Sequence, residues 1–276
     1  MDMQQLLQNQ QLLVTVKTYP LPTTIQGEIV CTAGITDKGE WIRIHNMPFR
    51  FLPGDKKFKK FQWIVIDLKK VNSDKRPETY TICNEEWKVG THISTVSGWS
   101  ERRRMVELAC IDDSMTEILE RMHSTNKSLT TLKPIEVTDF SWEPDTAQWP
   151  EKWMKKIQTE QSVFESIDPD SVVEKIPWKF YYSFITRNDN KPRKLSIIDW
   201  EIGALYRNLR MNSETEKDTL RKMKCKYLDD LASRDIHFFL GTHFKHQMIN
   251  APNPFMIIGV FAPPKYRDGD QLSINL

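Results

Sequence analysis

Long hydrophobic runs are absent from this sequence of 276 residues, although 39% of the residues are hydrophobic. No run of about 18 apolar residues is present, so the sequence contains no candidate transmembrane helix. Residues 1–11 are rich in glutamine and lack the basic and then apolar order of a signal peptide. We therefore expect a soluble, cytoplasmic protein that has no membrane partner.

Cysteine is scarce, and the familiar enzyme signatures are missing. The four cysteines, Cys31, Cys83, Cys110 and Cys225, form no CxxC pair, which argues against a zinc knuckle and a disulfide framework. We expect reduced, mostly buried thiols. Walker A, GxGxxG, HExxH, GxSxG and kinase motifs are also absent, so the sequence supports none of the activities that depend on them.

An excess of one charge is missing too, because 39 basic residues face 37 acidic ones and the net charge is +2. Net charge alone therefore does not indicate a nucleic-acid-binding protein. The basic residues are unevenly distributed, however, since residues 17–76 contain 12 basic and 6 acidic residues. A nearly neutral molecule with this distribution can carry one basic surface.

The first half of the chain is rich in short β-type segments. Strands are predicted at residues 14–17, 28–34, 41–45, 61–68 and 79–82. The polar, glycine-containing stretch 36–39 predicts a hairpin. So many short strands in about 70 residues favour a small barrel or curled sheet. Apolar residues at helical spacing follow Ser100, a candidate N-cap, and occur again at residues 115–122, which predicts two helices.

A length of 276 residues suits two domains. The stretch 139–150, with its proline and tryptophan residues, is the expected boundary, so the predicted domains are 1–140 and 141–276. The second domain is expected to contain helices near 151–160, 200–210 and 214–231, and strands at 180–185, 194–198, 236–241 and 255–261. The predicted fold class is α+β, with two β-rich barrel or curled-sheet domains and helical additions.

Aromatic and basic side chains in the first half form one candidate site. Single-stranded nucleic acid is held by stacking on aromatic faces, worth about 1–3 kcal/mol per base, and by cations along the backbone. Residues suited to these contacts are Trp41, Arg43, Arg50, Lys59, Lys60 and Trp63. An alternative stays open, in which the tryptophans belong to the core and the lysines solvate the opposite face. Residues 55–61 likewise either clamp phosphates or form a solvated connection that buries Phe58.

Three consecutive arginines, Arg102, Arg103 and Arg104, lie near a predicted helix start, where the helix dipole favours acidic residues. Their position therefore indicates a separate use. They serve either as anion contacts or in a salt-bridged domain interface.

Carboxylates and imidazoles in the second half form another candidate site. Asp199 and Glu201 follow a predicted strand and could bind a divalent metal, or Asp199 could cap the next helix. His243, Lys245 and His246 follow a later strand and could supply a general base, a metal ligand or a phosphate contact. Together these five residues resemble the catalytic set of metal-dependent nucleases.

Several segments resemble a family of uncharacterised bacterial proteins described as having a dual OB-containing domain. The matching segments are residues 16–20, 27–34, 39–44, 48–50, 76–78, 197–201, 238–242, 246, 257–261 and 263–265. The resemblance implies two OB-like barrels that bind nucleic acid, in a phage-defence or DNA-modification setting. It implies no catalytic residues. Residues 195–233 are too helical for a minimal OB barrel, so they indicate a helical insertion or a different second domain.

The resulting prediction is a nucleic-acid-binding protein, with DNA and RNA not distinguished. Arg43, Arg50, Lys59, Lys60 and residues 102–104 would contact phosphates, while Trp41 and Trp63 would stack on bases. One alternative is a metal-dependent nuclease or nucleotide-processing enzyme that uses the second candidate site and a divalent metal. Another is a subunit that binds protein partners from a defence operon through exposed aromatic residues.

Overall fold

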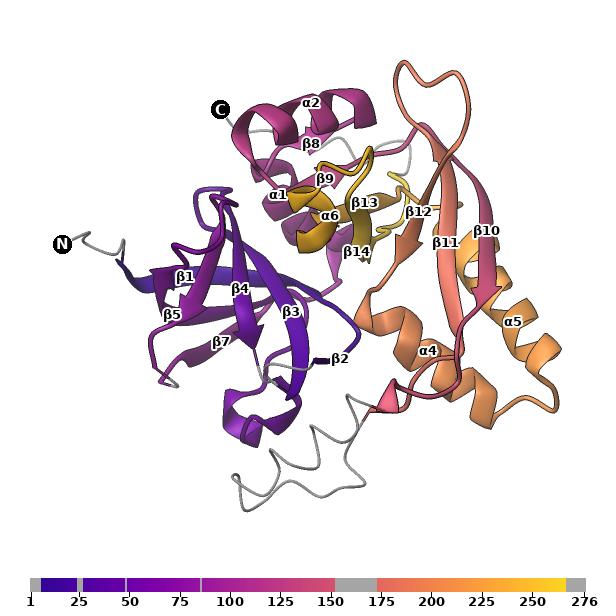
Figure 1. Ribbon diagram of the computed structural model, residues 1–276, viewed down its shortest axis with the longest axis horizontal. Coiled ribbons are helices and arrows are strands. Elements are labelled where there is room, and N and C mark those ends of the chain that lie inside the picture. Colours follow the sequence, from indigo (N-terminus) through magenta and orange to yellow (C-terminus); the bar gives the residue numbers. More distant parts are fainter. Residues whose placement is uncertain (1–5, 24–26, 48, 85, 152–172, 267–276) are drawn as a thin grey trace.

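The computed structural model describes residues 6–23, 27–47, 49–84, 86–151 and 173–266. Two β-sheets lie side by side, with the N-terminal strands in one and most of the C-terminal half in the other (Figure 1). Helices connect and flank the strands, which confirms the predicted α+β class. Within the described residues, no helix has the length and apolar character needed to span a membrane.

The first sheet contains a closed barrel. Its strands are β1 (Leu6–Lys17), β2 (Leu21–Thr23), β3 (Gly27–Thr36), β4 (Trp41–Met47), β5 (Gln62–Lys70), β6 (Thr79–Ile82) and β7 (Lys88–His92). Five strands follow the order β1-β3-β4-β6-β5, and the barrel closes because β1 pairs with both β3 and β5. β4 and β6 are parallel. The predicted hairpin is confirmed as the turn between β3 and β4.

The second half of strand β1, residues 12–16, is buried on both faces, which explains why it is mostly apolar. Leu12 and Val14 pack in the barrel interior, whereas Leu13 and Val16 belong to a separate cluster that the second domain completes. A strand with one face in water alternates apolar and polar residues, and a strand covered on both sides does not. The apolar run therefore reflects the contact between the domains.

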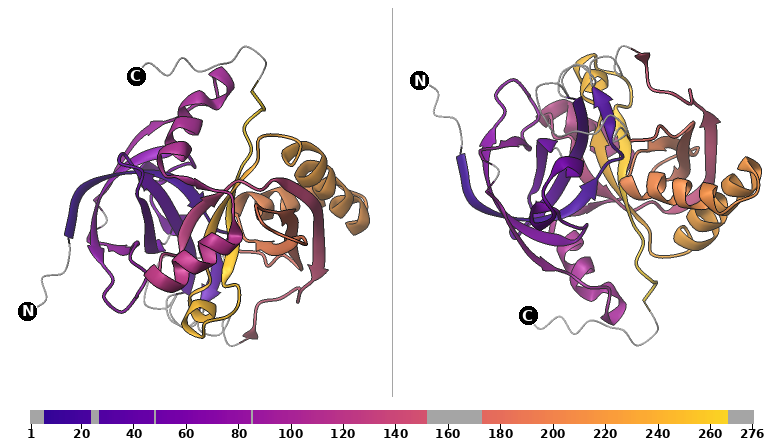
Figure 2. Two further views of the ribbon diagram at one scale, coloured as in Figure 1. Left: turned by 90° about the horizontal axis from the view of Figure 1, so that it is seen from above. Right: turned by 90° about the horizontal axis from the view of Figure 1, so that it is seen from below.

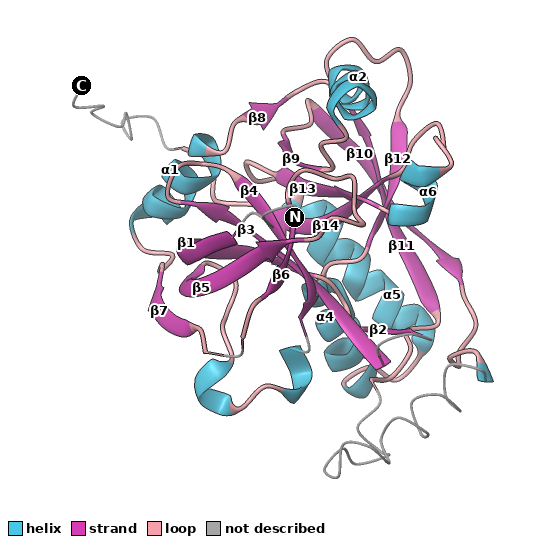
Figure 3. Ribbon diagram, turned by 60° about the vertical axis from the view of Figure 1, so that its left-hand side comes forward, coloured by secondary structure: helices cyan, strands magenta, loops and turns pink. Residues whose placement is uncertain are grey.

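The second sheet has the order β10-β11-β12-β14-β13-β9-β8. Its strands are β8 (Ile111–Asp112), β9 (Leu129–Leu132), β10 (Glu136–Pro144), β11 (Trp178–Ile185), β12 (Arg193–Ile197), β13 (His237–Thr242) and β14 (Phe255–Phe261). The helices of this half are α2 (Met115–Thr125), α4 (Trp200–Met211), α5 (Glu216–Lys224), the π-helical segment η5 (Cys225–Leu231) and α6 (Phe244–Met248). α4 and α5 lie against each other (Figure 3).

The two sheets share one strand order. In β1-β3-β4-β6-β5 and in β10-β11-β12-β14-β13, the first three strands in chain order lie side by side. The third strand in chain order pairs in parallel with the fifth, as β4 with β6 and β12 with β14. The second sheet does not close in the same way, because β13 pairs with β9. The connection between β12 and β13 contains α4, α5 and η5. The helical content of residues 195–233 is therefore an insertion at one point of the repeated order.

Residues 111–140 belong to the second sheet by their pairing, although the sequence-based division placed them in the first domain. β9 pairs with β13 over four residues, and β10 pairs with β11. The sheets therefore divide between α1 (Ser100–Leu108) and β8. Pairing between segments about 100 residues apart is not encoded in the local pattern from which the division was predicted.

Two other sequence expectations have clear outcomes. The expectation of mostly buried thiols is wrong, because all four cysteines are exposed. Cys31 shows the reason, since it lies on β3 between Val30 and Thr32, which are buried on the other face of the strand. The helix predicted near residues 151–160 lies almost entirely outside the described residues.

An apolar cluster joins the two domains. Leu13, Ile35 and Met105 of the first half contact a surface that includes Phe239 and Phe261 of the second. The backbones also meet where the chain leaves β1, since the Tyr19 amide donates to the Ile198 carbonyl at 2.8 Å. Both views of Figure 2 show β14, in yellow, alongside the indigo strands of the barrel. The interface therefore includes residues from both sheets.

Candidate functional site

The outer face of β4 carries two of the predicted nucleic-acid contacts, and the second domain covers it. Trp41 is half-buried and packs edge-on against Phe239, with ring centroids 5.5 Å apart. Arg43 is 7% exposed, and burial lowers its pKa to about 10. Its Nη1 has no hydrogen-bond partner among the described residues. The structure thus places both side chains in the domain interface, not on an open sheet face.

The remaining predicted contacts of the first half have different environments. Trp63 packs against the interdomain cluster, and Arg50 is half-buried in the 3₁₀ turn η1 (Phe49–Phe51). Lys59 is exposed, whereas Phe58, one residue before it, is 2% exposed. The connection 55–61 therefore buries its aromatic residues while leaving some of its lysines in water.

The three arginines of α1 point in three directions, because successive helical residues are rotated by about 100°. Arg103 is 3% exposed, forms an ion pair with Asp235 and donates to the Pro264 carbonyl. Arg104 is exposed. Arg102 faces a pocket between the domains. Arg103 therefore lies in a salt-bridged domain interface, whereas Arg102 lines the pocket.

Lys60 brings the two candidate sites together. Its Nζ lies 3.1 Å from Oδ2 of Asp199 and 2.8 Å from Oε2 of Glu201. Asp199 is fully buried, caps α4 by accepting from the Glu201 amide, and accepts from the Val260 amide at 3.1 Å. The hydrogen bond to the Glu201 amide therefore agrees with the capping interpretation. Asp199 connects α4 to β14 through the Val260 amide and to the barrel domain through Lys60.

Opposing effects set the protonation of this ion pair. Burial lowers the pKa of Lys60, but the two carboxylates outweigh burial and raise that pKa above its ordinary value. Burial raises the pKa of Asp199 to about 6, although the Lys60 charge opposes the shift. Both groups are therefore charged near pH 7, and the pair is an internal connection between the domains.

His243, Lys245 and His246 lie at the other edge of the second sheet. β12 is parallel to β14 and β13 is antiparallel to it, so β12 and β13 end at opposite edges. Asp199 follows β12, whereas His243 follows β13. The rings of His243 and His246 are 4.4 Å apart. Among the described residues, no group of three or more His, Cys, Asp or Glu side chains is suited to a metal.

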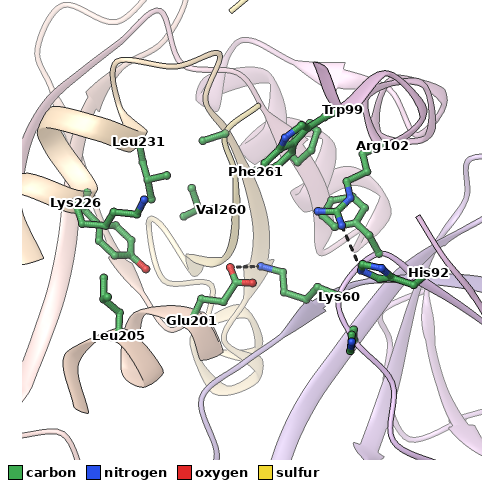
Figure 4. Close-up of a pocket in the computed structure, with 14 residues that line it drawn as sticks. Lys60, His92, Trp99, Arg102, Glu201, Leu205, Lys226, Leu231, Val260 and Phe261 are labelled. Carbon is green, nitrogen blue, oxygen red and sulfur yellow. Dashed lines mark hydrogen bonds and ion pairs between the residues drawn. The ribbon is translucent and has the colours of Figure 1, made fainter. Parts of the chain in front are cut away.

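A pocket of about 460 Å³ lies between the domains and is lined by residues of both candidate sites. We call it the interdomain pocket. The first domain supplies its polar side, which consists of Lys59, Lys60, His92 and Arg102. The second domain supplies an apolar wall of Leu205, Tyr227, Leu231, Val260, Phe261 and Ala262, together with Glu201 and Lys226. Phe61 and Trp99 complete the lining (Figure 4).

Arg102 is held in this pocket by several contacts. Its guanidinium lies 4.5 Å from the Phe61 ring centroid and 5.2 Å from that of Trp99. Nε and Nη2 donate to the Ile93 carbonyl at 2.9 and 2.7 Å. Nη2 also lies 3.2 Å from Nε2 of His92. Burial lowers the pKa of His92, and the Arg102 and Lys59 charges lower it further, so this imidazole is mainly neutral at pH 7.

Four lining residues, Lys59, Lys60, Arg102 and Glu201, are among the predicted site residues, whereas the other lining residues, including Trp99, His92 and Lys226, are not. Trp99 directly precedes the helix that carries the arginine run, and that position was an available signal. Nothing in the sequence pattern singles out His92 or Lys226. They approach the other residues only through the contact between the two sheets.

These features define an α+β protein of two β-sheet domains with a cationic and aromatic pocket between them. The chain belongs to the family described as "Domain of unknown function (DUF8757)", which matches residues 111–275. A second family, "Domain of unknown function (DUF8758)", matches residues 8–108. The two matches adjoin where α1 ends and β8 begins. A search of curated proteins found no match.

Proposed function

We propose that this protein binds nucleic acid at the interdomain pocket. The supporting observation is that the pocket brings Lys59 and Arg102 of the first domain and Lys226 of the second beside Phe61 and Trp99. Lys60 also lines the pocket, but its charge is paired with Asp199 and Glu201. Phosphates require cations, and bases favour apolar and aromatic surfaces. The pocket offers both within one cavity.

The shared strand order supports the OB-type part of this proposal. An OB-fold is a five-stranded Greek-key barrel that binds oligonucleotides on its second and third strands and the adjoining loops. The order of the first barrel, with its third and fifth strands parallel, suits this fold. Because Phe239 covers Trp41 on the β3–β4 face, the proposed binding site is the interdomain pocket, which residues outside β3 and β4 line.

The phage-defence or DNA-modification setting implied by the sequence resemblance is part of the same proposal. Its test is genetic. Phage plaque counts on cells that carry the intact gene are expected to fall below those on cells that carry the Lys59→Glu variant. Equal counts for every phage used would contradict the defence role without affecting the binding proposal.

Fluorescence anisotropy of labelled single-stranded and duplex DNA and RNA, at about 50 and 200 mM salt, tests binding. Binding of single strands is expected to weaken with salt, with a slope of about −0.7 per neutralised phosphate. Lys59→Glu and Lys226→Glu are expected to weaken binding because both residues are exposed and line the pocket. Lys191→Glu is the matched control, because this exposed lysine lies in the β11–β12 hairpin.

Two results would contradict the proposal. The first is the absence of salt-sensitive binding to any of the four nucleic acids. The second is an equal loss of affinity in Lys59→Glu and Lys191→Glu, which would move the binding surface away from the pocket. The geometry does not favour the nuclease alternative, because its residues lie at two edges of one sheet. A gel of the same samples with magnesium or manganese checks that the oligonucleotides stay intact.

A further inference from the structure

Two aromatic residues of the interdomain pocket have left-handed backbone conformations. Phe61 has φ 59° and Trp99 has φ 67°. Of the eight non-glycine residues with positive φ in the described chain, four are asparagines, and these two are the aromatic ones. Such a conformation is an outlier for a bulky side chain and persists only where surrounding contacts enforce it. Strained residues of this kind cluster at ligand clamps.

Both strained residues hold the same side chain. The Arg102 guanidinium contacts the Phe61 and Trp99 rings, and the Ile93 carbonyl fixes its Nε and Nη2. Within the described residues, Nη1 of Arg102 makes no hydrogen bond. A guanidinium fixed in this way has little freedom left to lose when it binds a phosphate oxygen. The two residues with positive φ therefore place their rings against a guanidinium that the Ile93 carbonyl also holds.

The two sides of the pocket differ in chemistry. Arg102 and His92 lie on one side, and Leu205 and Leu231 lie on the other, in the second domain (Figure 4). Glu201 lies between the two sides, and its side chain is 57% exposed while it pairs with Lys60. A ligand that fits has an anionic end, an apolar planar end, and hydrogen-bond donors between them.

We propose that the interdomain pocket binds a single nucleotide unit, with its phosphate at Arg102 and Lys59 and its base against the apolar wall of the second domain. The proposal rests on the proposed function and specifies its ligand. Glu201 then accepts from a ribose hydroxyl. The volume of about 460 Å³ lies within the range of about 300–1,000 Å³ that small-ligand sites occupy. Further stacking positions are not offered by the β3–β4 face, because the second domain covers it.

The same chemistry is present in a free mononucleotide and in the phosphorylated end of a strand. Calorimetry with AMP, adenosine and inorganic phosphate tests the common requirement. AMP is expected to bind more than about tenfold more tightly than adenosine or phosphate, since only AMP uses both sides of the pocket. Equal affinities for AMP and adenosine, or no binding of AMP together with no preference for a terminal phosphate, would overturn the proposal.

Competition against the labelled strand distinguishes the two sources. An oligonucleotide with a 5′- or 3′-phosphate that competes more strongly than both AMP and its unphosphorylated form identifies a strand end as the ligand. AMP that competes as well as the phosphorylated strand identifies a free nucleotide. If strands bind without any effect of AMP or of terminal phosphate, the inference fails while the proposed function stands. If AMP binds and strands do not, nucleic-acid binding is contradicted and the ligand of the pocket is a free nucleotide.

Arg102→Gln and Arg104→Gln form a matched pair on one helix. The first is expected to reduce AMP affinity by more than about tenfold, and the second by less than about twofold, because Arg104 is exposed and does not line the pocket. Arg102→Lys is expected to retain little of the wild-type affinity for AMP, since a lysine lacks the planar group that fits between the rings. An equal response of the Arg102 and Arg104 variants would contradict the proposal.

The arginine side-chain signals of the wild-type protein provide a measurement that does not depend on a variant folding. The Arg102 Nε–H resonance is expected to shift when AMP or inorganic phosphate is added, and to stay unchanged with adenosine. A spectrum in which AMP moves no arginine Nε–H resonance would also overturn the assignment.

Discussion

Lys17 is a cation surrounded by aromatic rings at the domain interface. Its Nζ lies 4.0 Å from the Phe49 centroid and 5.5 Å from that of Trp200, and it donates to the Phe58 carbonyl at 3.1 Å. Burial, with the nearby Lys60 charge, lowers the pKa of Lys17 from 10.5 to about 8. Between these two pH values the unfolded chain holds more protons than the folded chain, so this group makes stability rise with pH.

We therefore expect wild type to gain stability relative to Lys17→Met between pH 8 and pH 10.5. Urea unfolding at several pH values in this window measures the difference. Lys191→Met, at an exposed position, should track wild type throughout. A constant difference between wild type and Lys17→Met would show that the Lys17 pKa is not lowered.

The buried pair of Lys60 and Asp199 leads to a second prediction at this scale. Lys60→Met leaves a fully buried carboxylate without its cation, which costs about 3–5 kcal/mol. Adding Asp199→Asn removes that charge and keeps an oxygen that can cap α4. We expect the double variant to be more stable than Lys60→Met alone, by urea unfolding at pH 7. A double variant whose loss equals the sum of the single losses would contradict the coupling.

At the scale of elements, the β3–β4 turn supports the helix that carries Arg102. Gly39 has φ 82°, and a Cβ there would overlap the carbonyl oxygen of Leu108 at the end of α1. Gly39→Ala is expected to cost more than the roughly 1 kcal/mol of backbone strain alone, and also to weaken AMP binding by displacing α1. Gly54→Ala is the control, because its Cβ would meet nothing within 4 Å. Thermal unfolding and calorimetry measure the two effects, and equal losses in both variants would contradict this account.

Local signals predicted individual elements well, because turns and caps depend on neighbouring residues. The polar turn before Trp41 forms the expected hairpin, and Asp199 caps α4. Strand direction is not a local property. Asp199 and His243 each follow a strand, but β12 and β13 run in opposite directions, so the expected catalytic set is divided. The sequence therefore supplied plausible site residues without the information needed to group them.

At the scale of the whole molecule, contact between the domains determines which predicted residues remain accessible. Trp41 meets Phe239, almost 200 residues away, and the sheet face predicted to bind nucleic acid becomes interface. The same contact brings Arg102 and Lys226 to one pocket. Neither outcome could be predicted from spacing along the chain. The α+β class and the β-rich character of both halves could be predicted from the sequence, because they follow from residue patterns within each strand.

The shared apolar cluster predicts that both domains unfold together. Phe239 is fully buried and lies between Trp41 of the barrel and Phe261 of the second sheet. Phe239→Ala is expected to cost about 3–5 kcal/mol. Either domain alone would expose its side of the cluster to water. The substitution should therefore lower the urea midpoint of a single transition in which both domains unfold. Far-UV circular dichroism and tryptophan fluorescence should therefore report the same urea midpoint in wild type and variant. Two separated transitions in wild type would mean that each sheet is stable without the other, and the interdomain pocket would then form only when the domains dock.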